Sequence, residues 1–294
     1  MKPNHSKLSA GRLLNGLALA LIGFITVYPF IYILSTSISL PSRLAERNVI
    51  ILPMGFDLST YGKVFADIRI VTGFKNSILY TVVGTVCSVL VTMMMAYPLS
   101  VQNEFRKYSK VIMRLVLVSM YFSGGMIPTY ILVNSLGLID KFWVMVIPSL
   151  VGSFNLILAR TFIRELPVDL YEAAIIDGAN EIYIFAKIVL PLSKPIIAVI
   201  TLYYAVGIWN SFFTPLLYLN SPEKLPLQIY LREMVIASQL QDYQSRTTFD
   251  RGVVFATEAV KSCTLVISTL PILIFYPFLQ KYFTKGVMIG AIKG

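Results

Sequence analysis

Residues 169–191 read DLYEAAIIDGANEIYIFAKIVLP, a polar, helix-forming stretch between two long apolar runs. Asp169 is placed to cap a helix whose third residue is Glu172, the spacing of a capping box. In a capping box, the side chain of each of the two residues accepts a hydrogen bond from the backbone N–H of the other. Gly178 can adopt the left-handed backbone that ends a helix. A helix this short is marginal alone in water. We therefore expect it to be held by a partner protein or by the following segment, 180–190.

The side chains of this stretch are typical of a docking surface. Ala173 and Ala174 leave the predicted helix flat enough for close approach, while Ile175 and Ile176 offer an apolar knob. In the segment after it, helical periodicity predicts that four residues line one face. These are Ile182, Phe185, Ala186 and Val189.

The composition indicates a membrane protein. Hydrophobic residues make up 56% of the chain, charged residues only 14%, and the mean hydropathy is +0.72. A soluble domain carries about a quarter charged residues. Six intervals contain no Asp, Glu, Lys, Arg or His, and each can cross a bilayer core, which needs about 20 apolar residues. The intervals are 13–38, 76–103, 115–139, 142–159, 195–222 and 262–280.

From these intervals we predict an all-α, polytopic membrane protein with six transmembrane helices in a single domain, 1–294. The first apolar run holds 26 uncharged residues, more than the core of a cleavable signal peptide, so we expect it to be retained. An N-terminus in the cytoplasm then puts 14 of the 25 Lys and Arg, the C-terminus and the loop 165–194 on that side, as the positive-inside rule favours. The predicted spans are 13–38, 76–100, 112–134, 142–163, 195–219 and 262–281.

Several classes of function are disfavoured. His5 is the only histidine, so we expect no zinc site, no Ser-His-Asp site and no catalytic residue. Cys87 and Cys263 are expected to be small apolar fillers in spans. The charge-free spans lack the titrating groups of an ion-driven transporter, and the chain lacks a phosphate-binding P-loop. The positive net charge is explained by topology, so no nucleic-acid partner is expected. A transporter of this kind takes its energy from another subunit.

The spacing of Glu172-Ala173-Ala174, Gly178, Ile188 and Leu190-Pro191 resembles the EAA coupling loop in membrane subunits of bacterial binding-protein-dependent ABC importers. The resemblance implies the type I importer fold in the bacterial cell membrane. It implies as partners a second homologous membrane subunit, two ATP-binding subunits and an extracytoplasmic sugar-binding protein, besides the lipid bilayer. ATP and Mg would be bound by the ATPase subunits, and this chain would hold no cofactor. The residues implied to couple to the ATPase are Glu172, Ala173, Ala174, Ile175, Asp177 and Gly178.

The resemblance extends over nearly the whole chain to the carbohydrate branch of that family, and especially to the smaller membrane subunit of maltose-type importers. Short motifs occur in the family's order. They are Leu52-Pro53, Tyr61, Phe74-Lys75-Asn76-Ser77, Leu136-Gly137-Leu138-Ile139-Asp140, Trp209-Asn210-Ser211-Phe212-Phe213, Pro215 and Leu225-Pro226-Leu227. The ending Gly290-Ala291-Ile292-Lys293-Gly294 resembles the tail that reaches between the ATPases, so Gly290, Lys293 and Gly294 are implied to contact them.

Two further sets of residues are candidates for roles in transport. An aromatic or amide side chain within a span suits sugar rings and hydroxyls, although helix packing is the more frequent use of both. The candidates for the pathway are Asn155, Tyr204, Trp209 and Asn210. Gly124, Gly125 and Pro128 should break the third span, which makes either a gating hinge or the end of a helix.

The function predicted from these observations is half of the translocation pathway of an ATP-driven importer for a sugar or oligosaccharide. A permease for a non-sugar solute is the nearest alternative, followed by an ion-driven secondary transporter. A membrane-embedded glycosyl- or acyltransferase would need a catalytic carboxylate. Asp140, Asp169 and Glu172 are dispersed over both sides of the membrane in the predicted topology.

Overall fold

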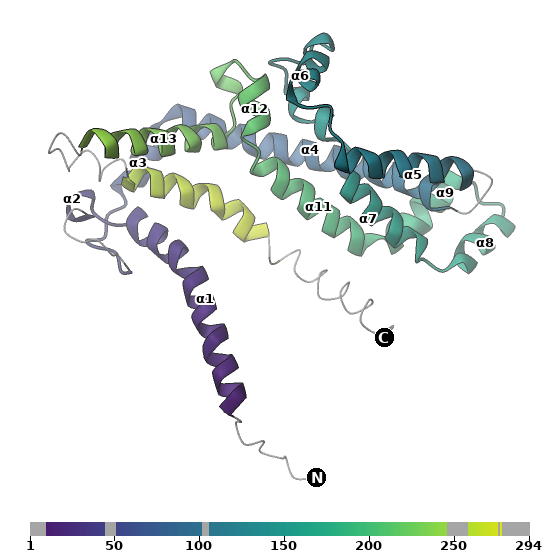
Figure 1. Ribbon diagram of the computed structural model, residues 1–294, viewed down its shortest axis with the longest axis horizontal. Coiled ribbons are helices and arrows are strands. Elements are labelled where there is room, and N and C mark those ends of the chain that lie inside the picture. The colour runs from purple at the N-terminus through teal and green to yellow at the C-terminus, as the bar shows by residue number, and fades with distance from the viewer. Residues whose placement is uncertain (1–9, 45–50, 102–105, 246–257, 276, 278–294) are drawn as a thin grey trace. The chain divides into compact units, whose positions relative to one another are not determined.

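The computed structural model describes residues 10–44, 51–101, 106–245, 258–275 and 277 (Figure 1). Within these ranges the secondary structure is helical, and the one β feature is an isolated bridge between Ser39 and Phe56. The all-α prediction is confirmed for this part of the chain. Two compact units are present, 1–67 with 231–269 and 68–230 with 270–294. The expected single domain over 1–294 stays a prediction.

The first unit contains α1 (Ala10–Ser37), α2 (Pro41–Leu44), α3 (Ser59–Ala66) and most of a helix over Glu258–Phe275. Its contacts use small polar groups. The Tyr61 hydroxyl donates to Ser37 Oγ at 2.8 Å, and the buried Cys263 thiol donates to the Ser37 carbonyl at 3.1 Å. Cys263 is thus a buried filler, as predicted, with one weak hydrogen bond. The apolar length of α1 is exposed within the chain.

The second unit is built around α4 (Ile68–Ser100), against which α7 (Ser153–Arg164) and α11 (Lys194–Trp209) pack. Met93, Leu156 and Ile200 are among the most fully buried side chains between these three helices. Figure 1 shows α8 and α9 together at one end of this unit, beside the end of α7. The remaining elements are α5 (Arg106–Tyr121), α6 (Met126–Ser135), the 3-10 helices η1 (Phe142–Met145), η2 (Ile147–Ser149) and η4 (Pro222–Lys224), α8 (Val168–Ile176), α9 (Glu181–Ile184), the π-helix η3 (Phe185–Val189), α10 (Leu190–Leu192), α12 (Phe213–Tyr218) and α13 (Leu227–Ser245), which passes from the second unit into the first.

Membrane-crossing helices occur in straight and broken forms. Among the described residues, three helices are long and apolar enough to cross a bilayer alone: Leu14–Ser37, Ile68–Ser100 and Glu258–Phe275. Three bent pairs raise the total to six if each pair counts as one span. The pairs are Lys107–Tyr121 with Met126–Ser135 at 118°, Phe142–Ser149 with Ser153–Arg164 at 52°, and Glu181–Leu192 with Lys194–Trp209 at 79°.

The observed helices differ from several of the predicted spans, among them 76–100 and 195–219. α4 begins at Ile68 rather than at 76, because Arg69 and Lys75 are compatible with helical backbone even though they interrupt the apolar run. The predicted span 195–219 is interrupted after Trp209, where α11 ends, and resumes as α12 at Phe213. The end of the predicted span 262–281 lies outside the described residues.

The predicted break in the third span is confirmed. α5 ends at Tyr121 and α6 begins at Met126, after Gly125 with a left-handed φ of +84°. Pro128 does not cause this break by removing a helical hydrogen bond, because it lies in the first turn of α6, where backbone N–H groups have no partner within the helix. The bend is therefore made by the glycine segment.

Three of the short motifs meet at one place in the second unit, which we call the polar latch: Asn76, Ser77, Asp140, Ser221 and Lys224. The Asp140 carboxylate accepts hydrogen bonds from the backbone N–H groups of Asn220 and Ser221, both at 3.0 Å, and from Lys224 Nζ at 2.7 Å. Asn76 Nδ2 donates to the carbonyls of Glu223 and Leu225, and Ser77 Oγ accepts from the Leu227 N–H at 2.9 Å. The latch joins the start of α4, the loop after α6 and the loop before α13.

The charge of Asp140 suits this role. Lys224 and the donors of Ser221 hold the pKa of the Asp140 carboxyl well below its usual range. Asp140 also has a φ of +56°, a conformation that Asp adopts more readily than most residues. Its backbone N–H donates to the Tyr218 carbonyl at 2.8 Å. An ionised Asp140 therefore fixes the loop after α6 to the end of α12.

Beside the latch, α4 and the start of α13 approach too closely for a side chain at Gly73. A Cβ there would lie 2.9 Å from the Tyr230 ring and 3.2 Å from Leu227 Cα. We predict that Gly73→Ala lowers the stability by about 1–3 kcal/mol, the usual cost of overpacking. Thermal unfolding of the purified protein in detergent measures this. Gly62→Ala in α3 is the control, because nothing lies within 4 Å of its new Cβ, and equal midpoints for the two variants would contradict the packing argument.

Candidate coupling site

The helix predicted from the EAA motif is α8, Val168–Ile176, and its start differs from the prediction. Pro167, with φ −57° and ψ 125°, precedes the helix, and no side chain caps it. Asp169 lies inside the first turn, so the predicted capping box with Glu172 is wrong. The fixed φ of Pro167 sets the entry of the chain instead. An acidic side chain in the first turn still interacts favourably with the helix dipole.

The predicted end of α8 at Gly178 is confirmed. Gly178 has φ +77°, its N–H donates to the Ile175 carbonyl, and the Ala179 N–H donates to the Ala174 carbonyl, both at 2.9 Å. These are the two bonds of a Schellman motif. They satisfy carbonyls that would otherwise be unpaired at the helix end, and they turn the chain sharply into the next segment.

The next segment begins as a helix capped by Asn180, whose Oδ1 accepts from the Tyr183 N–H at 2.8 Å. It then widens into the π-helix Phe185–Val189. The wider turn shifts the helical register, so the predicted face is wrong for Ile182 and Ala186, which are exposed. Ile184 and Val189 are the buried residues of this segment. A π-bulge inside a helix is frequent at functional sites.

The candidate coupling residues divide between two faces of α8. Ala174 is buried in the core of the second unit, at 7% exposure, and so holds the helix in place. Ile175 is half exposed and Ile176 is 85% exposed. The exposed candidates are Glu172, Ala173, Ile175, Asp177 and Gly178. Ala174 thus packs on its own chain, while the exposed positions present isoleucines, carboxylates and a glycine turn. Two of the exposed residues, Glu172 and Ile175, also border the space beside α8.

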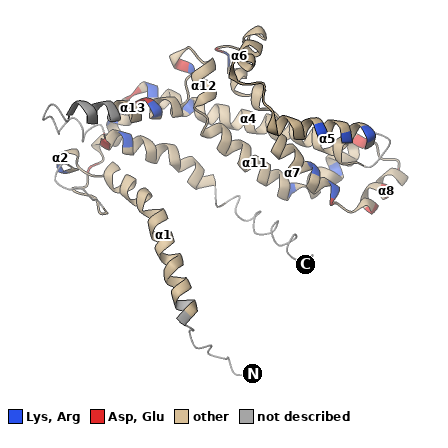
Figure 2. Cartoon of the chain, in the orientation of Figure 1, with Lys and Arg blue, Asp and Glu red and all other residues tan. Residues whose placement is uncertain are grey.

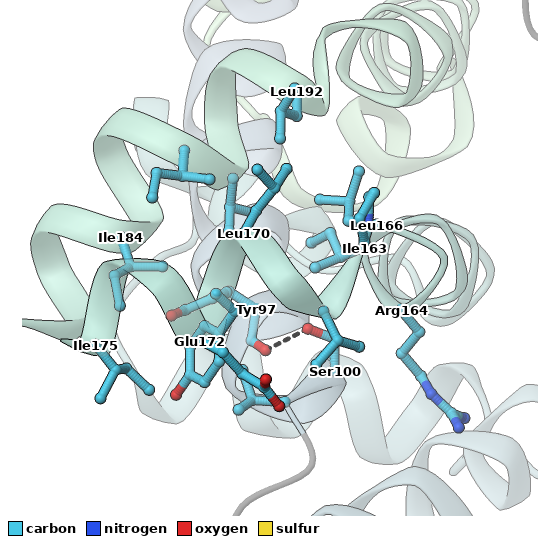
Figure 3. A pocket seen from close by; sticks show the side chains of 16 residues that line it. Tyr97, Ser100, Ile163, Arg164, Leu166, Leu170, Glu172, Ile175, Ile184 and Leu192 are labelled. Carbon is cyan, nitrogen blue, oxygen red and sulfur yellow. Dashed lines mark hydrogen bonds between the residues drawn. The ribbon is translucent and has the colours of Figure 1, made fainter. Parts of the chain in front are cut away.

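A cavity of about 480 Å³ lies beside α8. Figure 3 shows Leu170 and Ile175 of α8, Ile184 of α9 and Tyr97 of α4 among the side chains around it. Most of its lining residues are aliphatic, and the polar ones are Tyr97, Ser100, Arg164, Tyr171 and Glu172. The Ser100 hydroxyl donates to the Tyr97 carbonyl at 2.6 Å. The space beside α8 is therefore mostly apolar, and its walls come from four segments of the second unit.

Two tyrosines converge on one carboxylate beside this cavity. The Tyr171 hydroxyl of α8 donates to Glu181 Oε1 at 2.6 Å, and the Tyr97 hydroxyl of α4 donates to Glu181 Oε2 at 2.5 Å. Burial and the adjacent Glu181 carboxylate raise the pKa of Tyr171 to about 12, so its phenol keeps the donated proton at neutral pH. We did not foresee this cluster. The one signal for it in the sequence is Asn180-Glu181, a capping residue followed by an acid.

Charged residues are sparse along the middle of the helices of the second unit, and Figure 2 shows them near α12 and the start of α13 as well as at the end that carries α8. Arg160 Nε there donates to the Leu99 carbonyl at 2.8 Å, and so does Ser109 Oγ at 2.7 Å. These bonds satisfy a carbonyl in the last turn of α4, which otherwise has no helical partner. Among the described residues, no three His, Cys, Asp or Glu side chains lie together as metal ligands would.

Most candidates for the pathway are used in packing. The Tyr204 hydroxyl forms a hydrogen bond of 2.6 Å with Thr92 Oγ1 and accepts from the Gly152 N–H at 2.9 Å. Trp209 is buried and meets Phe74 edge to face at 5.9 Å, and Asn155 is also buried. Asn210 is exposed at the end of α11, where its Nδ2 donates to the Val206 carbonyl. The geometry brings Asn155 and Tyr204 together near Gly152 but does not gather all four.

The hinge candidates Gly124 and Gly125 lie between α5 and α6, two helices whose axes are bent by 118°. The third candidate, Pro128, lies in the first turn of α6. No heavy atom lies within 4 Å of a Cβ built on Gly124. The tail residues Gly290, Lys293 and Gly294 lie outside the described residues. Their contact with an ATPase stays a prediction.

A helical membrane domain with an exposed, Schellman-capped EAA helix defines a class of protein, the membrane permeases of ABC importers. Residues 88–289 match the family described as the binding-protein-dependent transport system inner membrane component, and the chain belongs to this family. The resemblance inferred from the EAA spacing is confirmed. The chain is therefore a membrane transport subunit.

Similar proteins cover nearly the whole chain. Protein LplC of Bacillus subtilis (strain 168) is 45% identical over 280 residues, covering 95% of this chain and 94% of LplC. The polygalacturonan/rhamnogalacturonan transport system permease protein YtcP of the same organism is 39% identical over 277 residues, covering 94% and 96%. A solved bacterial ABC transporter involved in the import of the acidic polysaccharide alginate has a chain 33% identical, with a TM-score of 0.84, covering 96% of this chain and 100% of that one.

Tyr204 offers a test of packing against substrate contact. We predict that Tyr204→Phe destabilises the protein by about 1 kcal/mol, because it leaves Thr92 and the Gly152 N–H without their partner. The thermal midpoint in detergent should fall by a few degrees. Tyr203→Phe is the matched control, since Tyr203 is half exposed and packs its ring on Phe154. A midpoint that falls equally in both variants would argue against the hydroxyl network.

Proposed function

We propose that this chain forms half of the translocation pathway of an ATP-driven importer for a sugar or oligosaccharide, and that α8 couples it to a separate ATPase. The observation that carries the proposal is the division of α8 into two faces. Ala174 fixes the helix to the core, while Ile175, Ile176 and Asp177 remain exposed within the chain. A partner that covers this outer face would move a helix whose Ala174 is already packed in the core of its own chain.

The partners follow from the same proposal. The family is binding-protein-dependent, which supports an extracytoplasmic solute-binding protein. A second homologous membrane subunit would complete the pathway, and two ATPase subunits would bind ATP and Mg. The end that carries α8 would face the cytoplasm, with both termini on that side. Gly290, Lys293 and Gly294 would contact the ATPases.

A carbohydrate cargo is supported by the relatives. YtcP is named for polygalacturonan and rhamnogalacturonan, and the alginate importer handles an acidic polysaccharide. An oligosaccharide that carries uronate groups is therefore the first cargo to test. A non-sugar solute is the alternative within the family. Asn210, exposed at the break between α11 and α12, is the candidate that we retain for contact with cargo, and Gly124 and Gly125 are the candidates for a gating hinge.

The proposal is tested by purification of the chain with its partners and reconstitution in liposomes. We expect a P-loop ATPase, a second membrane subunit and a solute-binding protein to copurify, and we expect uptake of a labelled oligogalacturonide or oligoalginate that requires ATP inside the liposome. Neutral oligosaccharides are the comparison for cargo. Uptake driven by a proton gradient without ATP would overturn the proposal.

Gly178 is the sharpest site for a variant in α8. We predict that Gly178→Asp lowers ATP-driven uptake about tenfold or more with membrane insertion intact, because it adds a charge and a strained Cβ at the docking turn. Uptake and substrate-stimulated ATP hydrolysis are measured in the reconstituted complex. Gly137→Asp is the matched control. Gly137, with φ +63°, ends α6 through the same pair of backbone bonds. Asp at this position therefore adds the same charge and the same backbone strain, but outside the proposed docking turn. Normal uptake by the Gly178 variant would contradict the coupling role of α8.

A further inference from the structure

We propose that Glu181 is a positioning residue that links α8 to α4, so that a displacement of α8 is transmitted to the central helix of the second unit. The inference rests on the proposed function and adds the route by which movement passes through this chain. The route runs from the Tyr171 hydroxyl through the two oxygens of Glu181 to the Tyr97 hydroxyl. It joins the consecutive helices α8 and α9 to α4, whose Tyr97 lies 84 positions before Glu181 in the sequence.

Glu181 connects the two tyrosines in series, because each of its carboxylate oxygens accepts from a different one. Tyr171 donates to one carboxylate oxygen at 2.6 Å and Tyr97 donates to the other at 2.5 Å, so neither tyrosine competes for the same acceptor. Hydrogen bonds to an ionised acceptor are shorter and stronger than neutral ones. Glu181 lies in the first turn of α9, after the Asn180 cap, where the helix dipole favours its negative charge. The carboxylate is therefore held at a defined place between two donors.

The α4 end of the link is rigid. Tyr97 is buried, at 7% exposure, and its ring lies 5.3 Å from the Phe185 ring. α4 in turn packs along α7 and α11. A pull on the Tyr97 hydroxyl therefore acts on a helix that is already part of the core.

Apart from the packing of Ala174, the α8 end has room to move relative to that core. α8 is a short helix between Pro167 and Gly178, and an apolar cavity of about 480 Å³ lies between it and the ends of α4, α7 and α9. Empty space on one side leaves room for displacement, and most of the residues that border it are aliphatic. Among the described residues, the hydrogen bonds that join α8 to α4 run from Tyr171 through Glu181 to Tyr97.

A purely structural role predicts something different. If Glu181 only stabilised the loop, its loss would lower the amount of folded complex, and uptake and ATP hydrolysis would fall together. If Glu181 instead transmits movement from α8 to α4, its loss leaves the complex assembled but lowers the amount of substrate imported per ATP hydrolysed. The two roles are therefore separated by that ratio.

The experiment uses the whole complex in liposomes, with labelled oligogalacturonide as the probe, and measures uptake and ATP hydrolysis side by side. We expect Tyr171→Phe and Tyr97→Phe each to lower the substrate imported per ATP by about fivefold, the factor that one net hydrogen bond is worth. The double variant and Glu181→Ala should be no worse than either single variant, because each cuts the same link. Copurification of the ATPase should be unchanged.

Glu165→Gln is the matched control, since Glu165 is an exposed carboxylate in the same loop at the end of α7 and takes no part in the link. An unchanged ratio in Glu181→Ala, or losses that add in the double variant, would overturn the role of Glu181 while leaving the importer assignment intact. A wild-type complex without ATP-driven uptake would instead overturn the proposed function and this inference with it.

Discussion

The helices of the second unit must adhere without charges in their apolar lengths and without the hydrophobic drive of a soluble core, because lipid is as apolar as their own side chains. Close packing at small residues and hydrogen bonds from hydroxyl groups meet this constraint. Gly84 admits Ile208, a Cβ at Gly73 would collide with Tyr230, and Thr92 bonds to Tyr204. The Tyr204 hydroxyl also holds the first backbone N–H before α7. One hydroxyl thus connects three elements.

The same constraint explains how short motifs gain meaning in space. Phe74–Ser77, Leu136–Asp140 and Leu225–Leu227 are too short to argue from singly, yet the fold gathers them into the polar latch. Each contributes what the others lack: Asn76 supplies donors, Asp140 supplies a charge, and the loop before α13 supplies carbonyls. Outside the apolar lengths of the helices, polar side chains hold loops to helix ends.

The sequence predicted the all-α class, the break at Gly125 and the left-handed turn at Gly178, because each depends on local backbone preference or on the absence of charge. It misplaced the start of α8, since Pro167 and Asp169 both suit a helix start and only the observed backbone decides between them. The face of the segment after Asn180 was wrong for a different reason. A π-helix inserts a residue into the turn, and no periodicity of 3.6 anticipates it. The link at Glu181 could not be predicted, because its partners Tyr97 and Tyr171 are brought to it by tertiary packing.

The six charge-free intervals have a consequence for energetics beyond their ability to enter a bilayer. Moving one elementary charge across a membrane potential of 100 mV changes the free energy by about 2.3 kcal/mol. The intervals contain no Asp, Glu, Lys, Arg or His, so a rearrangement of the predicted spans moves none of these charged side chains through the electric field. The potential neither favours nor opposes such a rearrangement through these segments. For a uronate-bearing cargo, the charge that crosses the field would therefore belong to the cargo and not to these spans.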